Sequence, residues 1–383
     1  IHGEWSDPIT IDQDGIDPSL YFEDGRAFFI SNGTDCEGRG GVVQCEINIE
    51  TGEKLTKSRC IWQGSGGRYL ESPHMYKIGK YYYLMAAEGG TEYGHMITYA
   101  RSESVWGKFE GYPHNPVLTN RNKAPFIIQG IGHGDLIQDK NGEWHIICLG
   151  FRQIHMWMTY HHLGRECFLI PVTFHEDGWF TAGNGTCEES YELSGDFAQL
   201  PLKTYTLENI GHDICHLRHP HTENYSITKD KITLKGTDVT LDDVASPTFA
   251  GVRQRDFDMD CSVIVSVSDG EGGLTVYSCE TEHYDLALRK NEGGYEAILR
   301  LNIGGIRHIE KAVQIPSGDA KLIIRSDSQV YKFFVQSQGE EIPMGFAMSK
   351  YLSSEVCGGF TGTVIGMYAV KGSAEFTDLR ISY

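Results

Sequence analysis

In the first half of the chain, apolar and aromatic runs alternate with turns that contain glycine. Three such runs, at residues 26–30, 80–85 and 143–148, each begin directly after a turn glycine. Short runs rich in aromatic and β-branched residues and bounded by Gly, Asp or Asn are typical of strands in hairpins. The pattern therefore predicts an all-β chain that begins with repeated hairpins.

A titratable residue opens the segment before each of these turns. Asp17, Glu71 and His133 lie 8, 8 and 9 positions before the turn glycine. The intervals between them are 54 and 62 residues, and a four-stranded propeller blade with loops takes roughly 40–50 residues or more. Residues 1 to about 195 therefore predict about three blades, although propellers have four to eight.

After about residue 200 the pattern changes to short alternating strands separated by Gly, Asp and Ser turns, which is typical of a β-sandwich. The predicted strands are residues 225–228, 231–234, 261–267, 274–277, 297–301, 321–325 and 330–335. We therefore predict two domains, part of a β-propeller over residues 1–198 and a β-sandwich over residues 199–383.

The charge and the cysteines narrow the classes of partner. With 33 basic and 52 acidic side chains, the formal net charge is −19, which argues against binding to nucleic acid or to an anionic membrane surface. No apolar stretch approaches the roughly 20 residues that span a bilayer. The 10 cysteines form no CxxC pair, so we expect reduced thiols and a cytoplasmic protein.

In a propeller, residues that begin the innermost strands converge on the central axis, so we expect Asp17 and Glu71 to face one cleft. Two carboxylates at one cleft can cleave a glycosidic bond, one as an ion and one as a protonated general acid. A purely structural alternative remains open, in which Asp17 caps a turn and Glu71 pairs with Arg68.

Several motifs resemble glycoside hydrolase family 43, and most closely its two-domain branch of β-xylosidases and α-L-arabinofuranosidases. In the first half these are residues 15–20, 69–77, 88–91, 113–119, 132–136 and 162–166. In the second half they are residues 217–221, 246–249 and 358–362. Together the motifs extend over nearly the whole chain.

The resemblance implies a five-bladed propeller followed by a β-sandwich, and inverting hydrolysis that releases terminal xylose or L-arabinofuranose. It places Glu71 on the general acid of the family. It places Asp17 on the aspartate that raises the pKa of that acid and orients it. It implies no required cofactor, although calcium can lie in the propeller channel near His133.

The resemblance also implies residues that bind the substrate. His133 matches the central histidine, and Arg165 matches an arginine that binds hydroxyl groups of the terminal sugar. Phe360 matches an aromatic residue that the sandwich contributes to the active site. Thr91 lies in a matched motif near the cleft and is a weaker candidate for substrate binding.

One part of the family pattern is missing. The general base is an aspartate in an N-terminal His-Pro-Asp-Pro-Ser-like segment, and Asp7 stands in a different context. We therefore expect a companion N-terminal polypeptide or segment to supply the base and the remaining blades. Relatives also imply a homo-oligomer. The alternative function is a non-catalytic protein that binds pentoses or xylan oligosaccharides and has lost its base.

Overall fold

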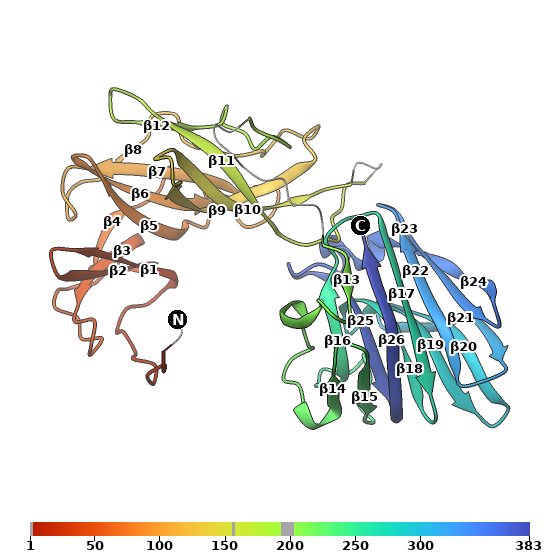
Figure 1. The fold of residues 1–383 in the computed structure, drawn as a ribbon. Helices are drawn as coiled ribbons and strands as arrows, with labels where there is room; N and C mark the ends of the chain where they lie inside the picture. Colours follow the sequence, from red (N-terminus) through yellow and green to blue (C-terminus); the bar gives the residue numbers. More distant parts are fainter. Residues whose placement is uncertain (1–2, 155–157, 193–202) are drawn as a thin grey trace. The chain divides into compact units, whose positions relative to one another are not determined.

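The computed structural model describes residues 3–154, 158–192 and 203–383. The chain divides into two compact units (Figure 1). The first unit comprises residues 1–152 and 166–197, and the second comprises residues 153–165 and 198–383. Among the described residues, every helix is too short or too polar to cross a membrane.

The first unit contains three antiparallel four-stranded sheets, coloured red to yellow-green in Figure 1. The first sheet consists of β1 (Ile16–Glu23), β2 (Arg26–Thr34), β3 (Gly40–Ile47) and β4 (Arg59–Trp62). The second consists of β5 (Glu71–Ile78), β6 (Tyr81–Glu88), β7 (Met96–Ser102) and β8 (Glu110–Gly111). The third consists of β9 (Ile128–Gln138), β10 (Trp144–Arg152), β11 (Glu166–Phe174) and β12 (Phe180–Ala182).

These sheets pack face to face because their strands alternate in side-chain direction. In β6, Leu84 and Ala86 enter the core shared with the first sheet. Tyr83 and Met85 of the same strand enter the core shared with the third sheet. A strand that is apolar on both faces is required where a sheet lies between two others, and this explains the continuous apolar run of β6.

The outer face of the first sheet is different. Ile16, Leu20 and Phe22 alternate along β1 and are 53%, 45% and 58% exposed. No other sheet covers this face within the part of the chain that is described. The third sheet likewise exposes apolar side chains, namely Ile137, Ile147 and Leu169. Both end sheets of the stack therefore carry apolar residues on a face that no described sheet buries.

The second unit is a sandwich of two antiparallel sheets. In the larger sheet, the order is β14 (Tyr225–Ile227), β15 (Ile232–Gly236), β26 (Gly372–Ser382), β17 (Met259–Val267), β22 (Asp319–Ser326), β23 (Val330–Ser337) and β24 (Glu340–Met348), and β13 (Tyr205–Thr206) pairs with β26. In the smaller sheet, the order is β16 (Thr248–Arg253), β25 (Val364–Val370), β18 (Glu271–Cys279), β19 (Glu282–Asn291), β20 (Gly294–Ile303) and β21 (Ile306–Ile315).

Helices are short and few in the described residues. They are η1 (Gly211–Asp213), η2 (Thr222–Asn224), η3 (Ser349–Leu352) and α1 (Ser354–Cys357). The core of the sandwich lies between its sheets and contains Val263, Leu286, Leu299, Phe333 and Phe376. The all-β prediction, with propeller-type sheets followed by a sandwich, is confirmed.

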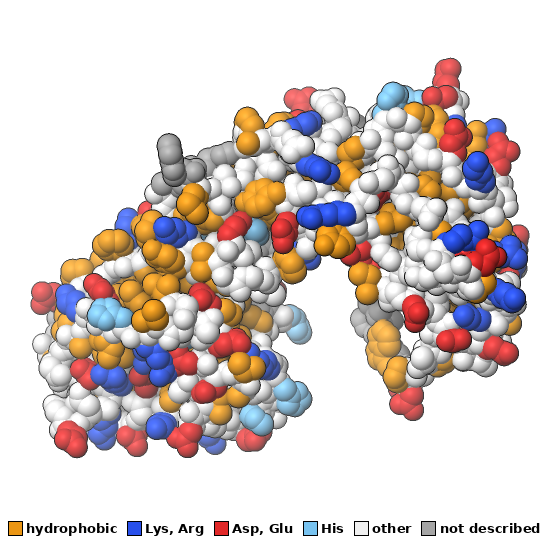
Figure 2. Space-filling model, turned by 180° about the vertical axis from the view of Figure 1, so that it is seen from behind, with side chains coloured by type: hydrophobic (Ala, Val, Ile, Leu, Met, Phe, Trp, Pro, Cys, Tyr) orange, Lys and Arg blue, Asp and Glu red, His pale blue; other side chains and the backbone are white. Residues whose placement is uncertain are grey.

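Residues 158–165 pack with the sandwich although they lie within the first half of the sequence. The carbonyl oxygens of His161, His162 and Leu163 accept hydrogen bonds from the Ser354 amide, the Thr363 amide and the Arg253 guanidinium. The sandwich therefore holds this segment through its backbone. Figure 2 shows one face of the molecule, on which basic and acidic side chains are interspersed although the chain has a net negative charge.

Candidate active site

The first strand of each sheet in the first unit carries a β-bulge. One extra residue lies between Ile16 and Ser19 in β1, between Glu71 and His74 in β5, and between Gly132 and Asp135 in β9. The second residue of each bulge has a positive φ, which is 50° at Asp17, 53° at Ser72 and 47° at His133. Bulges redirect side chains at strand ends and are common beside active sites.

The bulges correct the predicted equivalence of Asp17, Glu71 and His133. Asp17 and His133 occupy the same bulge position, but Glu71 lies one residue earlier and Ser72 takes that position. The reason is the turn: Glu23 pairs with Arg26 across Asp24-Gly25, whereas Ile78 pairs with Tyr81 across Gly79-Lys80. Glycine is the second turn residue in one hairpin and the first in the other, so counting from glycine shifts the register by one.

Glu71 is half-buried, and its carboxylate has no hydrogen bond or ion pair to another described residue. Burial raises its pKa above the ordinary value for glutamate, the charge of Asp17 raises it further, and His133 partly opposes this. Arg68 does not pair with Glu71. Its guanidinium lies 5.1 Å from the Tyr69 ring and donates to the Gly89 carbonyl at 3.4 Å. Among the described residues, Glu71 therefore has an elevated pKa and no hydrogen-bond or ion-pair partner, which suits a general acid.

Contacts between the first and second sheets fix Asp17. The Ser72 hydroxyl donates to Asp17 Oδ2 at 3.0 Å, so the residue after the candidate acid holds its carboxylate neighbour. Ser19 Oγ donates to the Pro73 carbonyl oxygen at 2.5 Å, two residues after Asp17 in β1 and one residue after Ser72 in β5. The bulges of β1 and β5 are thus joined side by side.

A second polar cluster joins the second sheet to the third. His74 Nδ1 lies 3.0 Å from Asp135 Oδ1, and the Tyr76 hydroxyl donates to the same oxygen at 2.9 Å. Tyr76 in turn accepts the Leu136 amide at 3.0 Å. Burial lowers the pKa of His74 although Asp135 opposes this, so the imidazole is neutral near pH 7. No sequence pattern predicted a role for these residues, although His74 and Asp135 directly follow the bulges in the matched motifs.

Glu88 is a positioning residue that the sequence analysis also missed. Its buried carboxylate accepts the amides of Ser65 and Gly67 at 2.7 and 2.6 Å and the Thr98 hydroxyl at 2.8 Å. These bonds fix the glycine-rich loop that leads into Glu71. Glu88 ends an apolar strand and opens the matched motif at residues 88–91, but neither signal indicates which groups its carboxylate binds.

His133 and Thr91 lie in the same unit. His133 is exposed. Its neighbour Gly132 packs under the buried His95, and a Cβ on Gly132 would lie 2.3 Å from the imidazole ring, so only glycine fits there. Thr91 is half-buried and follows Gly90, where a Cβ would lie 3.2 Å from the Tyr69 ring. Thr91 therefore follows a residue that lies close to Tyr69, in the loop that leads into Glu71.

Arg165 and Phe360 belong to the second unit and contact each other there. The Arg165 amide donates to the Phe360 carbonyl oxygen at 3.1 Å, and the guanidinium lies 3.8 Å from the centre of the Phe360 ring. Burial lowers the pKa of Arg165. Segments about 200 residues apart in sequence thus form one cation–π pair.

The described residues near His133 do not form a calcium cage. Calcium takes six to eight oxygen ligands, but one oxygen of Asp135 is bound by His74 and Tyr76, and one of Asp17 by Ser72. Among the described residues, no set of three or more metal-ligating side chains with atoms within 4.8 Å of one another includes His133. We therefore derive no catalytic step through calcium.

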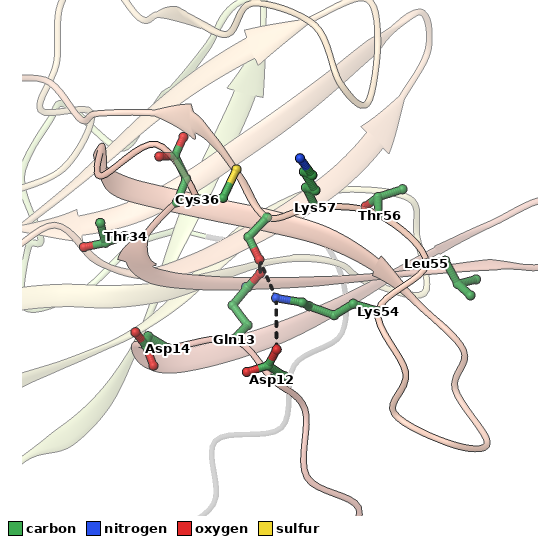
Figure 3. A pocket seen from close by; sticks show the side chains of 11 residues that line it. Asp12, Gln13, Asp14, Thr34, Cys36, Lys54, Leu55, Thr56 and Lys57 are labelled. Carbon is green, nitrogen blue, oxygen red and sulfur yellow. Dashed lines mark hydrogen bonds and ion pairs between the residues drawn. The ribbon is translucent and has the colours of Figure 1, made fainter.

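An open groove of about 580 Å³ lies elsewhere in the first unit, between residues 12–14 and residues 54–58 (Figure 3). Lys54 bridges its walls, 3.7 Å from Asp12 Oδ2 and 3.3 Å from Ser58 Oγ. Ser58 donates to Gln13 at 2.9 Å. These bonds attach the N-terminal segment to the first sheet, so we interpret the groove as structural.

Comparison with known proteins decides the family. The sequence profile of the glycosyl hydrolases family 43 matches residues 1–180, and that of the beta xylosidase C-terminal Concanavalin A-like domain matches residues 203–380. The chain is 37% identical over 380 residues to the non-reducing end alpha-L-arabinofuranosidase BoGH43B of Bacteroides ovatus, covering 96% of this chain and 71% of the relative. The chain belongs to glycosyl hydrolase family 43.

Further relatives agree with this. Xylosidase/arabinosidase 43B of Humicola insolens is 29% identical, with 100% of this chain and 77% of the relative covered. The crystal structure of a xylan beta-1,4-xylosidase from Bacillus halodurans superposes with a TM-score of 0.89 at 27% identity, covering 100% of this chain and 79% of that one. This family 43 chain is therefore a glycosidase whose similarity to its relatives includes the sandwich.

Proposed function

We propose that this glycosidase is an exo-acting enzyme that releases terminal xylose, and also L-arabinofuranose, from xylo-oligosaccharides and arabinosides with inversion. The observation that carries the proposal is the carboxyl of Glu71, which has no partner among the described side chains and whose pKa is raised by burial and by the neighbouring Asp17. The relatives named as xylosidases and arabinofuranosidases support the choice of pentose.

In the proposed reaction, Glu71 donates its proton to the glycosidic oxygen as the bond to the anomeric carbon breaks. Burial and the charge of Asp17 raise the pKa of Glu71, which favours its protonated form, and Asp17 is itself oriented by Ser72. A water molecule attacks the anomeric carbon from the opposite face. Its proton passes to a carboxylate roughly 6.5–9.5 Å from Glu71, the separation typical of inverting enzymes.

We propose that this base comes from outside the 383 residues, in a companion N-terminal polypeptide or segment. The apolar faces of the two end sheets support this, because further propeller sheets would bury them. We also propose that the completed assembly self-associates as a homo-oligomer.

We assign substrate binding to His133, Arg165, Phe360 and, more weakly, Thr91. The Arg165 guanidinium would donate to sugar hydroxyl groups, and the Phe360 ring holds it in position. His133 is exposed and close enough to Glu71 to affect its pKa. These roles predict a larger effect on KM than on kcat when Arg165 is changed.

We propose that bond cleavage requires no cofactor. Proton donation by a carboxylic acid and attack by activated water balance without electron transfer. Dialysis of the complete assembly against a chelator should leave kcat on nitrophenyl xyloside unchanged. A loss of turnover that added calcium restores would contradict this.

We also propose a cytoplasmic location, supported by ten cysteines without a disulfide. Recovery of the protein in the secreted fraction would contradict this location.

The central experiment is Glu71→Gln in the complete assembly. Without the acid, turnover of xylobiose should fall by about 10²–10⁴-fold, because its sugar leaving group requires protonation. Nitrophenyl xyloside should lose less, since its leaving group departs without a proton. Glu103→Gln, a change at an exposed residue paired with Lys80, is the matched control and should keep full activity.

Wild-type rates of Glu71→Gln on xylobiose would show that Glu71 is not the acid. Comparing nitrophenyl xyloside with nitrophenyl arabinofuranoside decides the preferred pentose. Binding of xylose without turnover of either substrate, even with the companion segment present, would favour the alternative of a non-catalytic sugar-binding protein.

A further inference from the structure

Two cysteines and a buried glutamate meet at one end of the sandwich, outside the residues assigned to hydrolysis. Cys279 ends β18, Glu282 begins β19 directly across the hairpin, and Cys357 ends α1. One ligand atom from each, the two Sγ atoms and a carboxylate oxygen, lies within 4.8 Å of the others. Segments almost 80 residues apart thus bring three metal-ligating side chains together.

The carboxylate of Glu282 is notable for its partners. The side chain is buried, 5% exposed, and no Lys, Arg or His of the described chain forms an ion pair with it. It accepts only from neutral groups, namely Cys279 Sγ at 2.7 Å, the Thr281 hydroxyl at 2.5 Å and the Gly304 amide at 3.0 Å. A buried carboxylate is stable when a cation neutralises it, and no side chain within the described ranges supplies one.

Both thiols are accessible to the same ion. Cys279 and Cys357 are half-buried, and their Sγ atoms belong to one cluster with the Glu282 carboxylate. A metal ion that binds the two sulfur atoms displaces their protons.

We propose that Cys279, Glu282 and Cys357 bind a thiophilic divalent cation, with Zn²⁺ as the chemical type. Two thiolates and a carboxylate are zinc ligands. Tetrahedral bond lengths of about 2.3 Å to sulfur and 2.0–2.2 Å to oxygen place ligand atoms roughly 3.3–3.8 Å apart. The three ligand atoms lie within 4.8 Å of one another, which is close to that spacing. The Thr281 hydroxyl, 3.4 Å from Cys279 Sγ, or a water molecule would complete the set.

A disulfide between the two cysteines explains the site less well. It would satisfy the two sulfur atoms but would remove the thiol that donates to Glu282, leaving that buried carboxylate with neither a cation nor this donor. The metal accounts for all three residues at once.

The site would anchor the loop that carries Phe360. Cys357 is followed by Gly358 and Gly359, both with positive φ of 71° and 72°, and then by Phe360. A metal bond from Cys357 to the β18–β19 hairpin would fix the start of this glycine pair. The structural role is local to the sandwich and does not depend on the proposed sugar specificity.

The test uses the reduced full chain, stripped of metal with a chelator and then given one equivalent of Zn²⁺ or Co²⁺. We expect one tightly retained Zn²⁺ per chain, a thiolate-to-Co²⁺ charge-transfer band, and protection of Cys279 and Cys357 from alkylation by mass spectrometry. Cys279→Ser and Cys357→Ser should abolish retention, and Glu282→Gln should weaken it at least tenfold, as even loss of an outer-shell partner does. Cys36→Ser, at an exposed cysteine, is the matched control.

Retention of Zn²⁺ that is unchanged by Cys279→Ser and Cys357→Ser would overturn the proposal. So would equal alkylation of these two cysteines with and without Zn²⁺ in the wild-type chain, a measurement that needs no variant to fold. A chain that is folded by circular dichroism, fully reduced and binds no Zn²⁺ would also overturn it.

Discussion

Asp17, Ser72 and His133 adopt the left-handed conformation at the start of three strands. Each costs of order 1 kcal/mol or more relative to an extended residue, so surrounding contacts must maintain it. At Asp17 and Ser72 one contact is their mutual hydrogen bond. The strained backbone at Asp17 thus directs its carboxylate towards Glu71 on the neighbouring sheet.

The residue Asp17 gives a test of how charge controls the acid. Because its carboxylate raises the pKa of Glu71, Asp17→Asn should lower that pKa. Less of the acid is then protonated at neutral pH, so the alkaline limb of the kcat/KM profile should move to lower pH. The profile of the complete assembly on xylobiose measures this.

Ser72→Ala separates charge from orientation, since it removes the hydrogen bond but keeps the charge of Asp17. Its alkaline limb should move much less than that of Asp17→Asn. Equal profiles for Asp17→Asn and wild type would show that Asp17 does not set the pKa of the acid.

The sequence located this region but not its register. Spacing from the turn identified the segments of Asp17, Glu71 and His133 because a hairpin fixes distance from its turn. It missed the one-residue offset of Glu71, since a bulge and a change of turn leave the spacing almost unaltered. The links through Ser72 and Asp135 are contacts between sheets, and no local pattern predicts them.

At the scale of elements, the alternating pattern located β14, β15, β17, β18, β20, β22 and β23 of the sandwich but not β13, β16, β19, β21, β24, β25 or β26. β17, β22 and β23 lie inside the larger sheet and were located from alternation alone. β21 is an edge strand with charged, mostly exposed residues, and β24 is an edge strand that contains Pro343. Charges and proline protect sheet edges from pairing with other chains, and the same features conceal such strands in a sequence.

A buried ionic network joins three strands of the smaller sheet. The Asp285 carboxylate contacts His283 and Arg300, each at 2.9 Å, and accepts the Thr275 hydroxyl at 2.8 Å. Arg300 also pairs with Glu271 at 2.7 Å. Burial alone would raise the pKa of Asp285, but His283 and Arg300 outweigh it and lower the pKa to about 2.

Asp285→Asn should cost about 3–5 kcal/mol of unfolding free energy at pH 7, because it leaves a buried arginine with reduced compensation. The folded-state pKa is below the unfolded value of about 3.9, so the stabilisation is present above about pH 4 and is lost as pH falls towards about 2. The difference between variant and wild type should shrink over that range in urea titrations. Asp319→Asn, at an exposed residue of β22, should show little cost; a constant difference for Asp285→Asn would contradict the ionic account.

At the scale of the whole molecule, the exposed apolar faces predict association. Leu20→Lys places a charge in the centre of the outer face of β1 without entering a core. We expect it to reduce the mass measured by light scattering for the native assembly. Ile306→Lys, at an exposed position of the sandwich, should leave the mass unchanged. A wild-type chain that remains a stable 42.9 kDa monomer would contradict the expectation that another polypeptide covers the outer face of β1.

The chain also crosses between its two units more than once, because residues 153–165 belong with the sandwich. The pattern of predicted strands changes near residue 200 and gives no sign of this insertion. The insertion depends on hydrogen bonds from its backbone carbonyl groups to Arg253, Ser354 and Thr363. Suppose that two relatives exchange sandwiches by recombination at one crossover near residue 200. The chimaera would then carry residues 158–165 of one parent and the sandwich surface that binds them from the other parent. Functional chimaeras should need matched residues 158–165, so the sandwich is inherited as a discontinuous module rather than as a C-terminal cassette.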